Sequence, residues 1–227
     1  MNEREPLLNA NLKLFMLAMV LANVAGNMYS VLLPLYLTAL DADVVQVGLF
    51  FTLARFFPLV LQIFGGWLSD SLGRLRSIAI GSVAGVISYA GLILAPSWQW
   101  VLVGEGLGAI TRSLIGPSFA AFIAEQSSEE NRARVFGVTQ SIFGIVSVVG
   151  PPLGGILAGW WGYRLMLLFA AGLYTSAALI RVRMARVAME NEEKPAEKPS
   201  LSGLRGNLGA VLALVPVSYT HLRAHET

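Results

Sequence analysis

The sequence predicts an all-α membrane protein built from six membrane-spanning helices. Of its 227 residues, 55% are hydrophobic and only 13% are charged, whereas soluble domains carry about 25% charged residues. Apolar runs long enough to cross a bilayer as helices recur along the chain. Arginines gather in alternate connections between these runs, as expected where the connections face the cytoplasm. The expected spans are residues 14–40, 44–68, 77–95, 98–124, 135–159 and 165–180.

The first span follows a short polar segment, residues 1–13, which we expect in the cytoplasm. The apolar run is much longer than the core of a signal peptide, so it reads as a retained span. Asn23 and Asn27 fall on one side of it, and Pro34 is expected to kink its outer part. Polar side chains within a span face either other helices or a water-filled cavity, and both interpretations remain open for the two asparagines.

The second and fourth spans carry charged residues. Arg55 lies about 16 Å into the second span by the helical rise. Glu105 and Arg112 are seven positions apart in the fourth span, which places them on nearly the same face. A carboxyl group in a low dielectric holds its proton more readily, and a nearby arginine favours the charged form. Glu105 is therefore a candidate proton carrier, and the alternative is a structural ion pair with Arg55 or Arg112.

The last part of the chain changes character after the sixth span. Arg181, Arg183 and Arg186 are expected to form a basic cluster on the cytoplasmic side, so the six-helix region covers residues 14–186. Residues 187–200 predict a charged cytoplasmic linker, and residues 201–216 the start of a truncated seventh span. Residues 217–227 back-translate to an adapter used in sequencing libraries, and we expect this tail to be non-native.

The connection between the second and third spans, residues 65–76, is predicted to be a tight turn at the membrane surface. Gly73 allows a positive φ there, and the Asp70 carboxylate suits exposed N–H groups at a helix end. The stretch resembles the signature loop of the major facilitator superfamily, Gly-x-Leu-(Ala/Ser)-Asp-(Arg/Lys)-x-Gly-Arg-(Arg/Lys). Ser71 and Leu75 stand where a basic residue is usual, and Arg76 restores one of the two charges. The matching residues are Gly66, Leu68, Ser69, Asp70, Gly73 and Arg74.

A second resemblance lies in the fifth span, to the motif Gly-x8-Gly-x3-Gly-Pro-x2-Gly-Gly of antiporter branches of this superfamily. Val146 stands where a glycine is usual, and the alternative interpretation is a glycine and proline kink of any helical bundle. In the fourth span, Leu102 and Glu105 replace an arginine and a glutamine common in relatives. The residues matching the antiporter-type motif are Gly137, Gly150, Pro151, Gly154 and Gly155.

The resemblance implies the N-terminal half of a twelve-span transporter, built from two inverted three-helix repeats. The implied function is secondary active transport by alternating access, as proton-coupled efflux of small molecules or drugs. The implied central cavity takes Asn23, Asn27, Glu105 and Arg112, with the third and sixth spans outside it. The implied partners are a small-molecule substrate, protons, the lipid bilayer and a C-terminal six-helix half, without which the chain is not expected to transport.

Two other functions remain open, a carrier for organic anions or sugars and a non-transporting six-span scaffold. An enzyme is not expected, because no histidine lies in a span and no nucleotide-binding loop is present. The chain has no cysteine, and neither a metal nor another cofactor is expected. The charge pattern gives no reason to expect nucleic-acid binding. The expected location is the inner membrane of a bacterial or archaeal cell, with the N-terminus in the cytoplasm.

Overall fold

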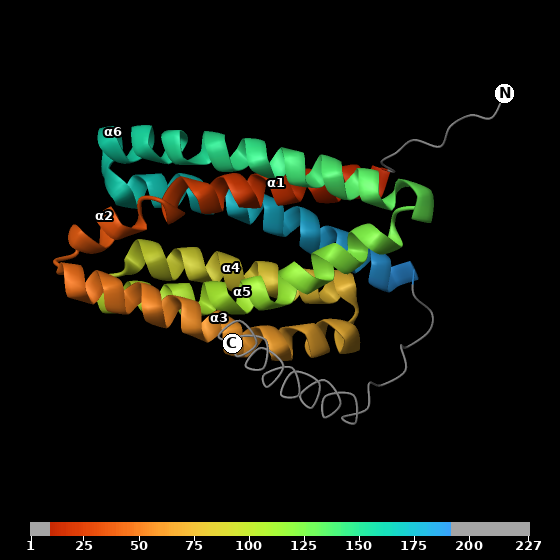
Figure 1. The fold of residues 1–227 in the computed structure, drawn as a ribbon, viewed down its shortest axis with the longest axis horizontal. Coiled ribbons are helices and arrows are strands. Elements are labelled where there is room, and N and C mark those ends of the chain that lie inside the picture. Colours follow the sequence, from red (N-terminus) through yellow and green to blue (C-terminus); the bar gives the residue numbers. More distant parts are fainter. Residues whose placement is uncertain (1–9, 192–227) are drawn as a thin grey trace, which may run out of the picture. The chain divides into compact units, whose positions relative to one another are not determined.

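The computed structural model describes residues 10–191, without the side chains of residues 57, 60, 62–70, 190 and 191. In this part of the chain the regular structure is entirely helical (Figure 1), which confirms the all-α prediction. The predicted seventh span (201–216) and the predicted tail (217–227) lie outside the described residues. The helices are α1 (Ala10–Ser30), α2 (Leu33–Thr38), α3 (Val44–Leu72), α4 (Arg74–Leu94), α5 (Trp98–Glu125) and α6 (Glu129–Asn191).

Helix α6 consists of two helices joined at a sharp bend. Gly162 interrupts the helical backbone with φ 80° and ψ 166°, a conformation that glycine adopts without steric cost. We call residues 129–161 the first arm of α6 and residues 163–191 its second arm. In Figure 1 the second arm runs back toward the end of the bundle at which the first arm begins. The bend therefore separates the predicted fifth and sixth spans.

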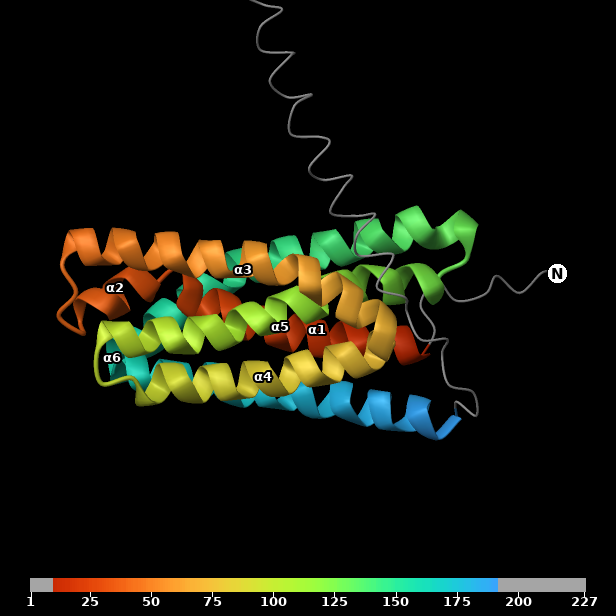
Figure 2. The same ribbon diagram turned by 90° about the horizontal axis from the view of Figure 1, so that it is seen from below.

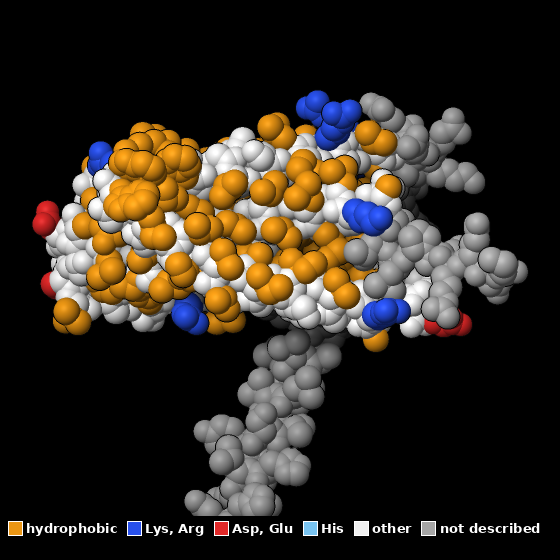
Figure 3. All heavy atoms as spheres, turned by 90° about the horizontal axis from the view of Figure 1, so that it is seen from above, with side chains coloured by type: hydrophobic (Ala, Val, Ile, Leu, Met, Phe, Trp, Pro, Cys, Tyr) orange, Lys and Arg blue, Asp and Glu red, His pale blue; other side chains and the backbone are white. Residues whose placement is uncertain are grey.

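The long helices run up and down the bundle in alternation (Figures 1 and 2). The connections at Gly73 and at residues 126–128 lie at one end, where α1 begins, and those at residues 39–43, 95–97 and 162 lie at the other. On the face in Figure 3, hydrophobic side chains are spread over the whole length of the bundle and charges lie mainly toward the two ends. Among the described residues, α1, α4, α5 and α6 are long and apolar enough to cross a membrane.

The predicted first span, residues 14–40, is not one continuous helix. Helix α1 ends at Ser30 and α2 begins at Leu33, so the break precedes Pro34. The proline lies in the first turn of α2, where its missing N–H group would have no intrahelical acceptor. The Tyr36 hydroxyl of α2 donates a hydrogen bond of 2.9 Å to the carbonyl oxygen of Leu92 in α4. This bond fixes the short helix against the bundle.

The prediction of a tight turn over residues 65–76 is wrong in its extent. Helix α3 continues to Leu72 and α4 starts at Arg74, so only Gly73 separates them, with a φ of 87°. Hydropathy locates the part of a helix that lies in lipid, but a helix can continue beyond it. Arg74 Nε donates to Glu125 Oε1 at 3.3 Å, which joins the start of α4 to the end of α5. The signature residues Gly66, Leu68, Ser69 and Asp70 therefore lie in α3, and Arg74 and Arg76 lie in α4.

The helix that contains the predicted sixth span extends beyond that span, so the predicted start of the linker is wrong. The second arm of α6 continues through Asn191, so residues 187–191 of the predicted linker are helical. Arg181 was expected in a basic cluster on the cytoplasmic side, but it is 1% exposed and its side chain contacts α1 and α4. Its neighbours Arg183 and Arg186 are not buried in this way. Neighbouring helices bury Arg181, and the charge pattern along the sequence does not show which residues other helices bury.

The antiporter-type motif lies where the first arm of α6 packs against α1. A Cβ atom on Gly150 would lie 2.5 Å from the Asn27 Cβ, and one on Gly154 would overlap the Met28 carbonyl oxygen. At these two positions only glycine permits the observed approach of the helices. Gly155 has nothing within 4 Å of a built Cβ atom. The motif glycines therefore do not all have the same packing role.

Candidate functional site

Glu105 on α5 is the buried carboxylate at the centre of the candidate site, with 6% of its surface exposed. Its Oε1 accepts a hydrogen bond of 2.8 Å from the Tyr29 hydroxyl of α1. Its Oε2 accepts a bond of 3.1 Å from Arg112 Nη2, which makes an ion pair on α5 itself. Of the two arginines considered as partners, the structure brings Arg112 to Glu105. The pair spans seven positions, so both residues lie on one face of the helix.

Glycines on α4 and α5 allow close packing of the helix that carries this pair. A Cβ atom on Gly104 would lie 3.0 Å from the Leu92 side chain, and one on Gly91 would lie 3.2 Å from the Gly104 Cα atom. The Ser88 hydroxyl of α4 donates a hydrogen bond of 2.8 Å to the Gly104 carbonyl oxygen. Close approach to α4 thus fixes α5, and the Glu105 side chain reaches Tyr29 on α1.

Arg55 on α3 shares a cavity with Glu105 but does not pair with it. Among the described residues no ion pair includes Arg55, and its surface is exposed. The cavity, of about 520 Å³, includes Tyr29, Glu105 and Arg112 in its lining. Arg55 therefore faces the same space as the ion pair. We call this space the α3-side cavity.

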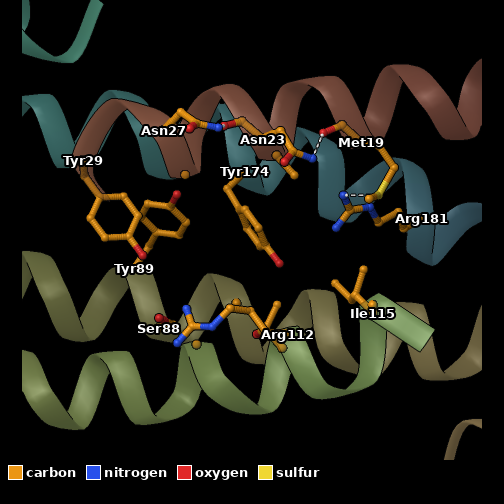
Figure 4. Close-up of a pocket in the computed structure, with 16 residues that line it drawn as sticks. Met19, Asn23, Asn27, Tyr29, Ser88, Tyr89, Arg112, Ile115, Tyr174 and Arg181 are labelled. Carbon is orange, nitrogen blue, oxygen red and sulfur yellow. Dashed lines mark hydrogen bonds between the residues drawn. The ribbon is translucent and has the colours of Figure 1, made fainter. Parts of the chain in front are cut away.

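A second space, which we call the main cavity, has a volume of about 420 Å³ and lies between α1, α4, α5 and the second arm of α6 (Figure 4). Asn23 and Asn27 line it from α1, and the Nδ2 of each donates to the carbonyl oxygen four residues earlier, at 2.8 Å. Arg112 lines both cavities, and 47% of its side chain is exposed. The Tyr29–Glu105–Arg112 cluster thus stands between the two spaces.

The structure adds four residues that the sequence analysis did not select: Tyr29, Tyr89, Tyr174 and Arg181. Helix α4 and the second arm of α6 were expected outside the cavity, but Tyr89, Tyr174 and Arg181 from these helices line it. Tyr174 and Arg181 are seven positions apart, the same one-face spacing that singled out Glu105 and Arg112. That signal was present in the sequence. Tyr29 had no comparable signal, because its partner lies on another helix.

The arrangement offers proton and anion chemistry. The Glu105 carboxylate accepts one hydrogen bond from the neutral Tyr29 hydroxyl and one from the Arg112 guanidinium. A proton bound to the carboxylate would compete with the guanidinium for it. Two arginines line the main cavity, and none of its sixteen lining residues is acidic. Within residues 10–191, no group of three or more His, Cys, Asp or Glu side chains is placed to hold a metal ion.

Comparison with known proteins gives one family and several relatives. The family model described as Major Facilitator Superfamily matches residues 15–223. The Quinolone resistance protein NorA of Staphylococcus aureus (strain MRSA252) is 25% identical over 150 residues, which cover 66% of this chain and 38% of that protein. The Multi-drug resistance efflux pump PmrA homolog of Lactococcus lactis subsp. lactis (strain IL1403) is 29% identical over 157 residues, with the same coverage.

Solved structures agree on the fold. The crystal structure of the peptide transporter POT in complex with sulfate matches with a TM-score of 0.73 at 14% identity, covering 93% of this chain and 45% of that one. The human organic anion transporter MFSD10 (TETRAN) matches with a TM-score of 0.60 at 21% identity, covering 76% of this chain and 46% of that one. The chain spans less than half the length of the relatives and structures that it matches.

Proposed function

Because the chain belongs to the major facilitator superfamily, a family of integral membrane transporters, we propose that it forms part of a secondary active transporter. The transporter works by alternating access and exports small molecules in exchange for protons. Two features favour export: the antiporter-type motif, whose Gly150 and Gly154 lie against α1, and the two relatives named for drug resistance. The proposed location is a bacterial inner membrane, with the N-terminus in the cytoplasm.

The observation that carries the proposal is the buried Glu105 with both carboxylate oxygens occupied. Arg112 holds one oxygen and Tyr29 holds the other across the gap between two helices. A proton on Glu105 removes the charge that attracts Arg112, and the guanidinium is then free to swing into either cavity that it lines. Proton binding by Glu105 therefore frees the Arg112 cation for the substrate, so Glu105 links the two events.

Transport further requires, in this proposal, a second six-helix half. The matching regions cover 38% of the curated relatives and 45–46% of the matched structures. In alternating access, a central site is closed in turn by two halves that rock against one another. The exposed apolar side chains Ile145, Val148 and Leu153 on the first arm of α6 supply a surface that such a half could cover.

Reconstitution into liposomes tests this function. Vesicles would carry the 227-residue chain alone, or the chain with the C-terminal half encoded by its uninterrupted genomic reading frame. A quinolone is the probe, with a pH gradient as the energy source and internal pH recorded at the same time. We expect no transport by the chain alone, and coupled movement of quinolone and protons with both halves. Proton-independent transport by both halves would reject the coupling, and robust transport by the chain alone would reject the requirement for a second half.

A carrier for organic anions is the second candidate, because the main cavity has a positive lining. Arg112 and Arg181 line it and no carboxylate does, so the cavity suits an anion better than a cation. Competition experiments in the same vesicles separate the two functions. Inhibition of quinolone transport by small organic anions, but not by organic cations, would favour the anion carrier.

A further inference from the structure

We propose that Arg181 and Tyr174 form an anion-binding subsite deep in the main cavity, which takes the carboxylate-like head group of a small organic anion. This inference names a substrate class for the cavity, so it rests on the proposed transport function. Arg181 lies in the second arm of α6, where the sequence predicted only a cytoplasmic basic residue. The structure instead places it in the cavity lining, with 1% of its surface exposed.

The hydrogen bonds of Arg181 all go to neutral groups. Its Nη1 donates to the Ser82 hydroxyl at 3.2 Å, and its Nη2 donates to the Ala18 carbonyl oxygen at 3.2 Å and to the Met19 sulfur at 3.0 Å. Among the described residues no carboxylate forms an ion pair with Arg181. A buried guanidinium without a counter-ion is costly, because the lost hydration of the charge is not replaced by a nearby negative charge.

Two donors in the subsite remain unused. Arg181 Nε and the Tyr174 hydroxyl are both buried, and neither has a hydrogen-bond partner. The guanidinium carbon of Arg181 lies 5.9 Å from the centre of the Tyr174 ring. Figure 4 shows Tyr174 projecting from α6 into the space between Arg181 and Arg112. Buried donors without a partner, beside a cation without a counter-ion, complement an oxyanion.

The surrounding residues favour a small ligand with an apolar or aromatic body. Tyr89 is 5% exposed and lies beside Tyr174, with ring centres 5.1 Å apart. Neutral polar groups from Asn23, Asn27, Ser88 and Thr111 also line the cavity, next to aromatic rings and small apolar side chains. The cavity volume of about 420 Å³ falls within the range typical of small-molecule sites, about 300–1,000 Å³. An aromatic carboxylate matches both the positive charge of Arg181 and the aromatic side chains that line the cavity.

A purely structural role for Arg181 makes a different prediction. Ser82 also donates its own hydroxyl to the Ile78 carbonyl oxygen at 2.7 Å, and the Ala18 carbonyl lies within helix α1. Replacing Arg181 by methionine therefore leaves neither of these two acceptors without another hydrogen bond, while it removes a buried charge and keeps an unbranched side chain. If the arginine serves binding, the Arg181→Met chain should melt at the same temperature as the wild type or higher. If it serves folding, the melting temperature should fall.

The test uses the full 227-residue chain in lipid nanodiscs, with equilibrium binding measured for three probes of similar shape. These are benzoate, benzamide and benzylammonium, which are anionic, neutral and cationic. We expect wild-type protein to bind benzoate at least fivefold more tightly than either other probe. Arg181→Met should weaken benzoate binding at least tenfold without changing benzamide binding. The control Arg183→Met, which removes the exposed arginine two positions away, should leave all three affinities unchanged.

Tyr174→Phe provides a second variant that keeps the packing of the ring and removes only the unpartnered hydroxyl. We expect it to fold normally and to weaken benzoate binding about threefold. Equal affinity of the wild type for benzoate and benzamide would overturn the subsite, whatever the variants do. So would unchanged benzoate binding in Arg181→Met, or in Tyr174→Phe if the first variant does not fold. If the chain binds anions selectively but supports no proton-coupled transport together with its second half, the proposed function is rejected and the subsite stands.

Discussion

Gly154 on the first arm of α6 provides a quantitative test of the packing between this arm and α1. A Cβ atom at this position would overlap the Met28 carbonyl oxygen and come within 2.7 Å of the carbonyl carbon. These are backbone atoms of α1, so no side-chain rotation can relieve the overlap. Gly154→Ala therefore forces the two helices apart. Gly155→Ala is the matched control, because nothing lies within 4 Å of a Cβ atom there.

The expected difference between the two variants follows from two opposing effects. Alanine favours a helix over glycine by about 1 kcal/mol, and this gain is shared by both variants. Overpacking costs about 1–3 kcal/mol, and it applies only to Gly154→Ala. The difference in the free energy of unfolding is therefore about 1–3 kcal/mol, with Gly154→Ala the less stable. On the scale of soluble chains of this size, that corresponds to about 2–12 °C in Tm.

Thermal melting of the purified chain in detergent micelles, followed by tryptophan fluorescence, measures this difference. Gly155→Ala should melt at the wild-type temperature or above, and Gly154→Ala clearly below it. Gly137→Ala is a second control in the same arm, since a Cβ atom there also has nothing within 4 Å. Equal melting temperatures for Gly154→Ala and Gly155→Ala would refute the close approach of the first arm to α1.

Three further predictions concern the ends of the bundle. Asp43→Ala should lower the free energy of unfolding by about 1 kcal/mol in the same melting assay, because Asp43 Oδ1 accepts from the Gln46 N–H at 2.8 Å in a capping box; an unchanged Tm would show that the cap adds nothing. Cysteines at Ser97 and Trp161 should react with an impermeant thiol reagent on intact cells, whereas one at Ser128 should not, and the reverse pattern would invert the proposed orientation. Asp70→Asn should impair transport by the two-half protein but leave membrane insertion intact, and normal turnover would reduce the signature segment to a connector.

The general fold was predictable because the bilayer imposes a simple length rule on apolar helices. Each predicted span overlaps a helix or an arm of a helix in the structure, and the positive φ of Gly73 follows from the residue type. The ends of the helices were less predictable. Hydropathy does not show that α3 continues to Leu72, or that the second arm of α6 continues to Asn191. Both extensions carry polar residues beyond the apolar run.

The candidate site was predictable only where its residues share one helix. Glu105 and Arg112 are related by the helical repeat, and the structure pairs them. Arg55 was an equal candidate because depth in the membrane says nothing about the distance between two helices. Tyr29 and Arg181 depend on which helices pack together, and their contacts reach partners 76 and 99 positions away. Such contacts are a property of the tertiary packing.

The central claim, that Glu105 couples proton movement to transport, is tested most directly by Glu105→Gln in the two-half protein. Glutamine keeps the size of the side chain but carries no charge to hold Arg112 and no group that titrates. The exposed Glu129→Gln is the matched control. Two measurements in liposomes separate the steps: accumulation of the quinolone driven by a pH gradient, and exchange of labelled for unlabelled quinolone without a gradient. We predict that Glu105→Gln loses accumulation but keeps exchange, and that Glu129→Gln keeps both. Accumulation against a gradient by folded Glu105→Gln protein would contradict the claim.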